Sequence, residues 1–158
     1  MAAPIQLPYR PCAGVMLVNS AGLIFTAMRH DAPGAWQMPQ GGIDKGEDPA
    51  KAAIRELYEE TGIKSVEMLG EAPDWLTYDL PPHLLGKALK GKYRGQKQRW
   101  FALRFVGQDD EVDLEHHEPE FSAWRWSTPD QVIADIVDFK RETYRQVLAA
   151  LDRYIVPA

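Results

Sequence analysis

Three of the four glutamates in the stretch GGIDKGEDPAKAAIRELYEETGI, residues 41–63, are crowded near its end. Glu56, Glu59 and Glu60 stand at positions i, i+3 and i+4, so at about 100° per residue their carboxylates project from one face of a helix. The helix dipole disfavours negative charge in the C-terminal half of a helix, and like charges at this spacing repel. Hard oxygen ligands on one rigid helix are what Mg²⁺ or Mn²⁺ prefers. The pattern indicates a divalent metal site; the alternative is a solvated acidic face of an amphipathic helix.

Local signals place these acids on a helix that runs from Pro49 to Thr61. Asp48 suits the N-cap and Pro49 the first helical position, while Gly62 suits the residue just past the helix end. The face away from the glutamates is apolar, so we expect it to pack against a sheet. Its members are Ala50, Ala53, Ile54 and Leu57.

Strand signals lie on both sides of this helix. Residues 12–29 form two apolar runs around the turn sequence Asn19-Ser20-Ala21-Gly22, which predicts a β-hairpin. We expect further strands within residues 34–42, 65–73, 74–80, 99–107 and 120–128, and a polar, basic loop over residues 81–98. Thr128 and Pro129 begin a C-terminal region whose apolar residues recur at helical intervals. This order predicts an α/β fold with a mixed sheet between helices.

Composition favours one globular domain over residues 1–158. A chain of 158 residues with 45% hydrophobic residues can bury a core without cross-links, and its single cysteine, Cys12, forms no internal disulfide. No signal peptide or membrane-spanning run is present, so we expect a cytoplasmic protein with no membrane contact and no obligate protein partner. A net charge of −5 argues against a broad basic nucleic-acid surface. An acidic domain that handles phosphates needs a cation or a local basic pocket.

The complete spacing pattern around the helix resembles the Nudix box of hydrolases that cleave nucleoside diphosphates linked to another group. Its fixed positions are filled by Gly41, Glu47, Arg55, Glu56, Leu57, Glu59, Glu60, Gly62 and Ile63. The resemblance implies an α/β/α sandwich with a central mixed β-sheet. It also implies that Glu56, Glu59 and Glu60 hold Mg²⁺ or Mn²⁺ with help from the Gly41 carbonyl. Glu47 and Arg55 would form a structural ion pair, in which a planar guanidinium orients a carboxylate.

Segments outside the box resemble the family branch that contains RNA 5′-pyrophosphohydrolases and dinucleoside polyphosphate hydrolases. They are YRPCAGVML, WQMPQGGID, GQKQRWFAL, PEFSAWRW and VDFKRETYRQV, and they extend from Tyr9 to about Leu151. The resemblance implies that Glu120, in PEF, completes the metal site. Considered without the family, Glu120 is an ordinary acid of a surface loop.

The same resemblance implies a set of substrate-binding residues. Arg10 and Arg29 would contact phosphate or base, and Gln40 and Gln98 would line the site. Tyr78 would stack near a base or brace the pocket, and Phe139 would flank a base. Lys97, Lys140 and Arg141 would contact phosphate or RNA. Each has an ordinary alternative as a solvated cation or a core side chain, and the helical spacing of Phe139 favours the core. Asp138 and Ala35 depart from the small hydroxyl residues common in RNA-cleaving members, which weakens the prediction for RNA-end recognition.

The expected reaction is metal-dependent hydrolysis of a polyphosphate attached to a nucleoside, with Glu56, Glu59 and Glu120 as catalytic residues. Glu59 is a candidate general base and Glu120 its rival. The substrate is either a 5′-triphosphate RNA end or a dinucleoside polyphosphate such as diadenosine tetraphosphate. The alternatives are a pyrophosphatase for other nucleoside diphosphate conjugates and a non-catalytic nucleotide sensor, although a sensor is expected to lack a box acid and none is missing.

Overall fold

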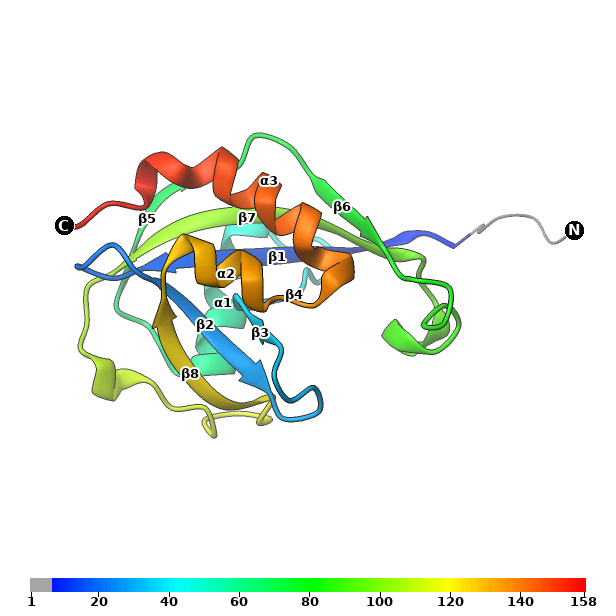
Figure 1. The fold of residues 1–158 in the computed structure, drawn as a ribbon, viewed down its shortest axis with the longest axis horizontal. Coiled ribbons are helices and arrows are strands. Elements are labelled where there is room, and N and C mark those ends of the chain that lie inside the picture. The colour runs from blue at the N-terminus through cyan, green and yellow to red at the C-terminus, as the bar shows by residue number, and fades with distance from the viewer. Residues whose placement is uncertain (1–6) are drawn as a thin grey trace, which may run out of the picture.

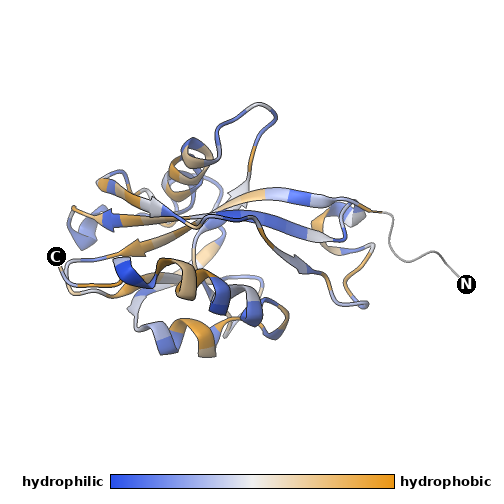
Figure 2. Ribbon diagram, turned by 90° about the horizontal axis from the view of Figure 1, so that it is seen from above, coloured by the Kyte–Doolittle hydropathy of each residue, from blue (hydrophilic) through white to orange (hydrophobic). Residues whose placement is uncertain are grey.

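The protein is described here by a computed structural model that covers residues 7–158. A mixed sheet lies between α1 on one side and α2 and α3 on the other (Figures 1 and 2). The helices are α1 Pro49–Thr61, α2 Pro129–Asp135 and α3 Arg141–Leu151, with short 3-10 turns η1 Ala88–Gly91, η2 Asp109–Glu111, η3 Asp138–Lys140 and η4 Asp152–Tyr154. The predicted α/β/α sandwich is confirmed.

The sheet is mixed because β1 and β7 run parallel while its other paired strands are antiparallel. Its main strand order is β3-β2-β1-β7-β5, and β4 pairs with β1, β6 with β7 and β8 with β2. The strands are β1 Tyr9–Val18, β2 Ile24–Arg29, β3 Trp36–Gln37, β4 Gln40–Gly42, β5 Val66–Glu71, β6 Leu76–Asp79, β7 Gly95–Phe105 and β8 Phe121–Ser127. The predicted hairpin corresponds to β1 and β2.

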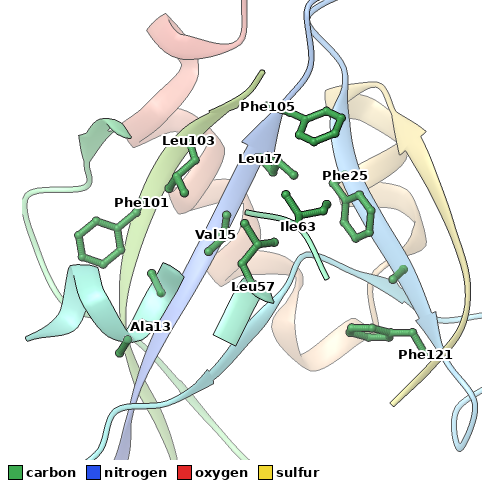
Figure 3. Close-up of a cluster of buried hydrophobic side chains, with 13 residues drawn as sticks. Ala13, Val15, Leu17, Phe25, Leu57, Ile63, Phe101, Leu103, Phe105 and Phe121 are labelled. Atoms are coloured by element: carbon green, nitrogen blue, oxygen red, sulfur yellow. The ribbon is translucent and has the colours of Figure 1, made fainter. Parts of the chain in front are cut away.

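Side chains of β1 alternate between two cores, one on each face of the sheet. Val15 and Leu17 belong to the core under α1, together with Leu57 (Figure 3). Met16 and Val18 belong to the core under α2 and α3. Because β1 is fully buried from Cys12 to Val18, it forms the rigid centre on which the neighbouring site residues are placed.

The structure corrects two helix predictions. Ile54 is 42% exposed, whereas Ala52 is buried, so the packed face of α1 is rotated relative to the predicted one. The predicted helical C-terminus consists of two helices, because Ile136 and Val137 adopt extended ψ angles of 151° and 142° between them. Local spacing does not distinguish one long helix from two that pack on the same core.

Two strand predictions also change. Residues 95–98 were expected to belong to the loop, but they begin β7, where they pair with β1 on one side and β6 on the other. The single strand expected within residues 34–42 is two short strands, since β3 pairs with β2 and β4 pairs with β1. In both places, pairing with strands distant in sequence decides the structure.

Candidate active site

The loop before α1 is fastened to the helix by one arginine. Arg55 donates from Nε to Glu47 Oε2 at 2.8 Å and from Nη2 to Glu47 Oε1 at 2.9 Å, so the predicted ion pair is present. Nη2 also donates to the carbonyl of Gly42 at 2.9 Å. The guanidinium and the backbone N–H of Asp44 together lower the pKa of Glu47 to about 2. Glu47 is therefore ionised and holds the loop in place at neutral pH.

Asp48 and Gly62 define the ends of α1 as predicted. The Asp48 side chain accepts a hydrogen bond from the backbone N–H of Lys51 at 3.1 Å. Gly62 has a φ of 75°, which is the left-handed conformation that glycine adopts at the C-terminal cap, and its N–H donates to Tyr58. The helix is consequently fixed at both ends, and the orientation of its glutamates is fixed with it.

Glu56, Glu59 and Glu60 differ in their surroundings although they share one helix. Arg55 Nη1 donates to Glu56 at 2.8 Å and to Glu59 at 3.2 Å. Glu60 is 5% exposed, and its buried Oε1 atom has no hydrogen-bond partner. Burial raises the pKa of Glu60 well above its ordinary value, and the nearby carboxylates of Glu120 and Glu56 raise it further. An unpaired buried carboxylate is costly unless something positive approaches it.

The pKa of Glu56 is also raised. Burial is the main cause, Arg55 opposes it, and Glu59 and Glu120 add to it. These mutual effects show that the four carboxylates share one region although Glu120 lies on a different segment. Within residues 7–158, the side chains as they stand form no group of three or more His, Cys, Asp or Glu that could hold a metal ion. The oxygens nonetheless fit a hard divalent cation, since Glu60 Oε1 is unpaired and the neighbouring carboxylates repel one another.

Gly41 makes room for this arrangement. A Cβ atom at Gly41 would lie 2.1 Å from Oε2 of Glu56, which is far closer than any side chain tolerates. Only glycine therefore allows the Glu56 carboxylate to lie against the backbone of β4. Gly42 serves Arg10 in the same way, because a Cβ there would lie 2.5 Å from Arg10 Nη2.

A cleft of about 690 Å³ brings most of the predicted site residues together. They come from β1, β2, β4, α1, β6, η3 and the loop before β8. The predicted residues that line it are Arg10, Arg29, Gln40, Gly41, Glu56, Glu59, Glu60, Tyr78, Glu120, Phe139 and Lys140. Carboxylates and cations thus lie in one cavity, as recognition of a metal-bound polyanion requires.

Two aromatic rings and a lysine form one wall of the cleft. The ring centroids of Tyr78 and Phe139 lie 5.6 Å apart, and Lys140 Nζ lies 5.4 Å from the Tyr78 centroid. The Lys140 residue as a whole is partly buried. Burial, followed by the positive charge of Arg29, lowers the pKa of Lys140 to about 8. Arg29 itself is held by Asp31 through hydrogen bonds of 2.8 and 2.9 Å.

Three predicted substrate residues do not line the cleft. Lys97 points to the other face of β7, where Nζ lies 5.1 Å from the ring centroid of Trp75. Gln98 is buried, with hydrogen bonds to Gln40 and Gln96. Arg141 donates to the carbonyls of residues 133 and 136, and to Asp138, so it closes the end of α2.

Some lining residues were not predicted from the sequence. Gln96 is 2% exposed and lines the cleft two residues before Gln98, on the same face of β7. Because side chains alternate along a strand, Gln96 shares the face of Gln98 in a β7 that begins at Gly95. Loop residues Leu84, Ala88 and Leu89, together with Asp31, His117 and Glu118, also line the cleft without any sequence signal.

The fold and the cleft define a Nudix hydrolase. Residues 8–147 match the NUDIX domain, and the chain belongs to this family, whose members generally use divalent metals. It is 56% identical over 149 residues to an RNA pyrophosphohydrolase of Cereibacter sphaeroides, an alignment that covers 92% of each chain. None of the helices formed by residues 7–158 is long and apolar enough to span a membrane.

Two solved structures show the same fold at low identity. The E. coli dihydroneopterin triphosphate pyrophosphohydrolase has a TM-score of 0.70 at 20% identity, over 90% of this chain and 99% of its own. A C. elegans Ap4A hydrolase complex has a TM-score of 0.65 at 22% identity, over 91% of this chain and 98% of its own. These likenesses establish the architecture.

Proposed function

We propose that this chain hydrolyses phosphoanhydride bonds at 5′-triphosphate RNA ends, releasing pyrophosphate and leaving a 5′-monophosphate. The observation that carries the proposal is the cleft. Its lining includes Glu56, Glu59, Glu60 and Glu120, together with Arg10, Arg29, Lys140 and the Tyr78–Phe139 pair. That combination provides for a metal-bound polyphosphate and an adjacent base. The RNA pyrophosphohydrolase name of the Cereibacter relative supports the same substrate class. We also propose that the chain acts as a single domain and that, with RNA as its substrate, it acts in the cytoplasm.

The metal-binding role is assigned to Glu56, Glu59, Glu60 and Glu120, with the Gly41 carbonyl as a further oxygen ligand. The unpaired Oε1 of buried Glu60 supports this assignment. A bound divalent cation, Mg²⁺ or Mn²⁺, would supply charge neutralisation and an acidified water molecule. Arg55 contacts Glu56 and Glu59, which keeps both carboxylates oriented toward the cleft.

Proton removal from the attacking water is assigned to a glutamate of this group. Glu59 is a candidate general base and Glu120 its rival, since both line the cleft and neither accepts hydrogen bonds from two nitrogens of Arg55 as Glu47 does. Glu56 is the third residue to which we assign a catalytic role, and its carboxylate lies close to the backbone of Gly41. Each role requires an oxygen within reach of a water molecule.

Substrate positioning is assigned to the cationic side chains of the cleft and to its aromatic pair. Arg10, Arg29 and Lys140 would bind phosphate oxygens, because guanidinium and ammonium groups form charge-assisted hydrogen bonds with phosphate. Tyr78 and Phe139 would hold a base by stacking. Gln40 would donate to the polyphosphate from the floor of the cleft.

RNA is favoured over a small dinucleotide by the charge of one segment. Residues 80–107 contain seven Lys or Arg residues and no Asp or Glu, within a chain whose net charge is −5. The loop of this segment contributes Leu84, Ala88 and Leu89 to the cleft, while Lys87, Lys90 and Lys92 are exposed beside it. A basic loop beside the cleft suits the phosphates that follow the first nucleotide of an RNA chain.

A dinucleoside polyphosphate is the second candidate, since it presents the same polyphosphate linked to a nucleoside and the acidic net charge suits a small substrate. A direct comparison tests both. The protein is incubated with Mg²⁺ and either 5′-triphosphate RNA or diadenosine tetraphosphate, and the products are resolved. We expect pyrophosphate from RNA at the higher kcat/KM. A higher kcat/KM for diadenosine tetraphosphate would reverse the assignment, and the absence of product from both would favour a sensor.

A further inference from the structure

Three glutamine side chains and one indole form a hydrogen-bonded chain next to the cleft. Trp100 Nε1 donates to Gln98 Oε1 at 2.9 Å. Gln98 Nε2 then donates to Gln40 Oε1 at 3.1 Å and to Gln96 Oε1 at 2.9 Å. Gln40 and Gln96 line the cleft, whereas Gln98 and Trp100 lie behind them.

The direction of this chain is determined at its buried end. An indole N–H only donates, so the Gln98 group that faces it must be the carbonyl oxygen. A flipped Gln98 amide would place its NH₂ group against the indole N–H and leave two buried donors without acceptors. Gln98 is 3% exposed, so water does not readily replace the missing partners.

Trp100 cannot move away to relieve this constraint. Its side chain is fully buried, and the ring of Tyr144 packs against it at a centroid distance of 5.7 Å and an interplanar angle of 78°. On β1, Gly14 leaves the space that the indole fills, because a Cβ there would lie 2.6 Å from three indole carbons. The position of the indole N–H is therefore set by the core.

The consequence appears at the surface of the cleft. Since Gln98 occupies the carbonyl oxygens of Gln40 and Gln96, the NH₂ groups are the ends of these amides that remain for a ligand. Ionised phosphate oxygens accept hydrogen bonds and donate none, so NH₂ groups are suitable partners for them. The two amides thus complement Arg10, Arg29 and Lys140, which are also donors.

We propose that Gln98 and Trp100 are positioning residues that lock Gln40 and Gln96 as hydrogen-bond donors toward the polyphosphate. This inference rests on the proposed function for the identity of the ligand. It assigns Gln98 a role through other side chains, in place of the direct contact expected from the sequence. A purely structural role for Gln98 would stabilise the fold without affecting the orientation of the two amides.

The first test is the Gln98→Met variant, which keeps the length of the side chain and removes both of its hydrogen-bonding groups. We expect KM for 5′-triphosphate RNA to rise about ten-fold while kcat changes less than about three-fold, because ground-state binding is weakened. The Gln40→Ala/Gln96→Ala double variant should show a similar increase. Adding Gln98→Met to that double variant should have no further effect, since coupled residues are not additive. Multiplicative effects would overturn the proposal.

A second test does not depend on turnover. NMR signals of the Gln40 and Gln96 side-chain amides, assigned with the alanine variants, are followed as Mg²⁺ and the β,γ-methylene analogue of ATP are added. We expect both signals to shift in the wild-type protein and to shift much less in Gln98→Met. Equal shifts in the two proteins would overturn the lock. If the wild type bound the analogue but hydrolysed neither RNA nor diadenosine tetraphosphate, the proposed function would fail while this test remained valid.

A third variant guards against misfolding of Gln98→Met. Trp100→Phe preserves a buried aromatic ring but removes the N–H that fixes the Gln98 amide. We expect an intermediate rise in KM, about three-fold, because the loss of one hydrogen bond lets Gln98 adopt both orientations. Circular dichroism and the midpoint of thermal unfolding confirm that each variant is folded. A folded Trp100→Phe protein with wild-type KM and wild-type amide shifts would contradict the proposal.

Discussion

Arg55 and Glu47 form a bidentate ion pair, with N–O distances of 2.8 and 2.9 Å, between α1 and the loop that precedes it. The same guanidinium also donates to Glu56 and Glu59. The loop, the helix and the glutamates of the cleft are consequently tied to one side chain. A change at Glu47 is expected to affect stability first and activity through Arg55.

Glu47→Gln is predicted to lower the free energy of unfolding by about 1 to 3 kcal/mol at neutral pH, because it replaces a charge-assisted pair with a neutral one. The pKa of Glu47 is depressed from 4.5 to about 2, so its stabilising contribution is present above pH 4.5 and disappears as the pH falls toward 2. Urea unfolding of the two proteins at neutral and acidic pH measures the difference. An undiminished difference at the lowest pH would refute this origin. Glu115→Gln, on an exposed loop, is the control.

Glu56→Gln and Glu59→Gln are each predicted to reduce kcat at least about a hundred-fold while preserving the fold, since an amide neither binds a divalent cation as a carboxylate does nor accepts a proton from water. Initial rates at saturating Mg²⁺ and circular dichroism measure the two properties. Glu142→Gln, an exposed residue of α3, should behave as the wild type. Mg²⁺-dependent hydrolysis retained by both variants would rule out the assignment, and the comparison with Glu120→Gln separates the candidate bases.

Lys140 is predicted to give the reaction a pH dependence on its alkaline side. Because its pKa is about 8 in the folded protein, the ammonium is lost above that pH and kcat/KM for a polyphosphate should fall. Lys140→Arg should move this decline to higher pH, whereas Lys140→Met should lower kcat/KM about ten-fold or more below pH 8, where the wild type is charged. An unchanged alkaline decline in Lys140→Arg would assign it to another group.

The charged form of Lys140 destabilises the fold, whereas the charged form of Glu47 stabilises it. Its pKa is lowered from 10.5 to about 8 on folding, so the folded state disfavours the proton and stability increases as the pH rises from about 8 to 10.5. Without substrate, Lys140→Met should therefore be more stable than the wild type at neutral pH. Thermal unfolding midpoints at neutral and alkaline pH test this, and a lower midpoint for the variant at neutral pH would contradict it.

The basic loop is predicted to strengthen binding of RNA and to leave binding of the small substrate unaffected. Replacing Lys87, Lys90 and Lys92 with glutamine should raise KM for a triphosphate RNA of ten nucleotides and leave KM for diadenosine tetraphosphate unchanged. The slope of log KM against log salt should decrease by about 0.7 for each phosphate that the substituted side chains no longer bind. KM values measured over a range of NaCl concentrations provide this slope.

A control with equal charge removes three exposed cations outside the segment, namely Lys64, Arg145 and Arg153. This control changes the net charge by the same amount as the loop variant. If the loop contacts RNA directly, the control should preserve the salt slope, because its three cations lie outside the loop. Equal effects of the two triple variants would show that net charge alone is responsible.

The sequence by itself determined the helix that carries the glutamates. Asp48, Pro49 and Gly62 specify its ends through interactions within a few residues, and the spacing of Glu56, Glu59 and Glu60 places their side chains on one side. The family and the sandwich fold followed from the same local pattern. Such features can be read from the chain because they depend on neighbours in sequence.

The tertiary structure decided which of the other residues reach the cleft. Pairing of β7 with β1 and β6 turns Gln96 inward and Lys97 to the opposite face, and the break between α2 and α3 lets Arg141 bind carbonyls at the end of α2. Packing of Trp100 against Gly14 likewise fixes the direction of the Gln98 amide. These arrangements depend on contacts between segments distant along the chain, whose energies local spacing does not encode.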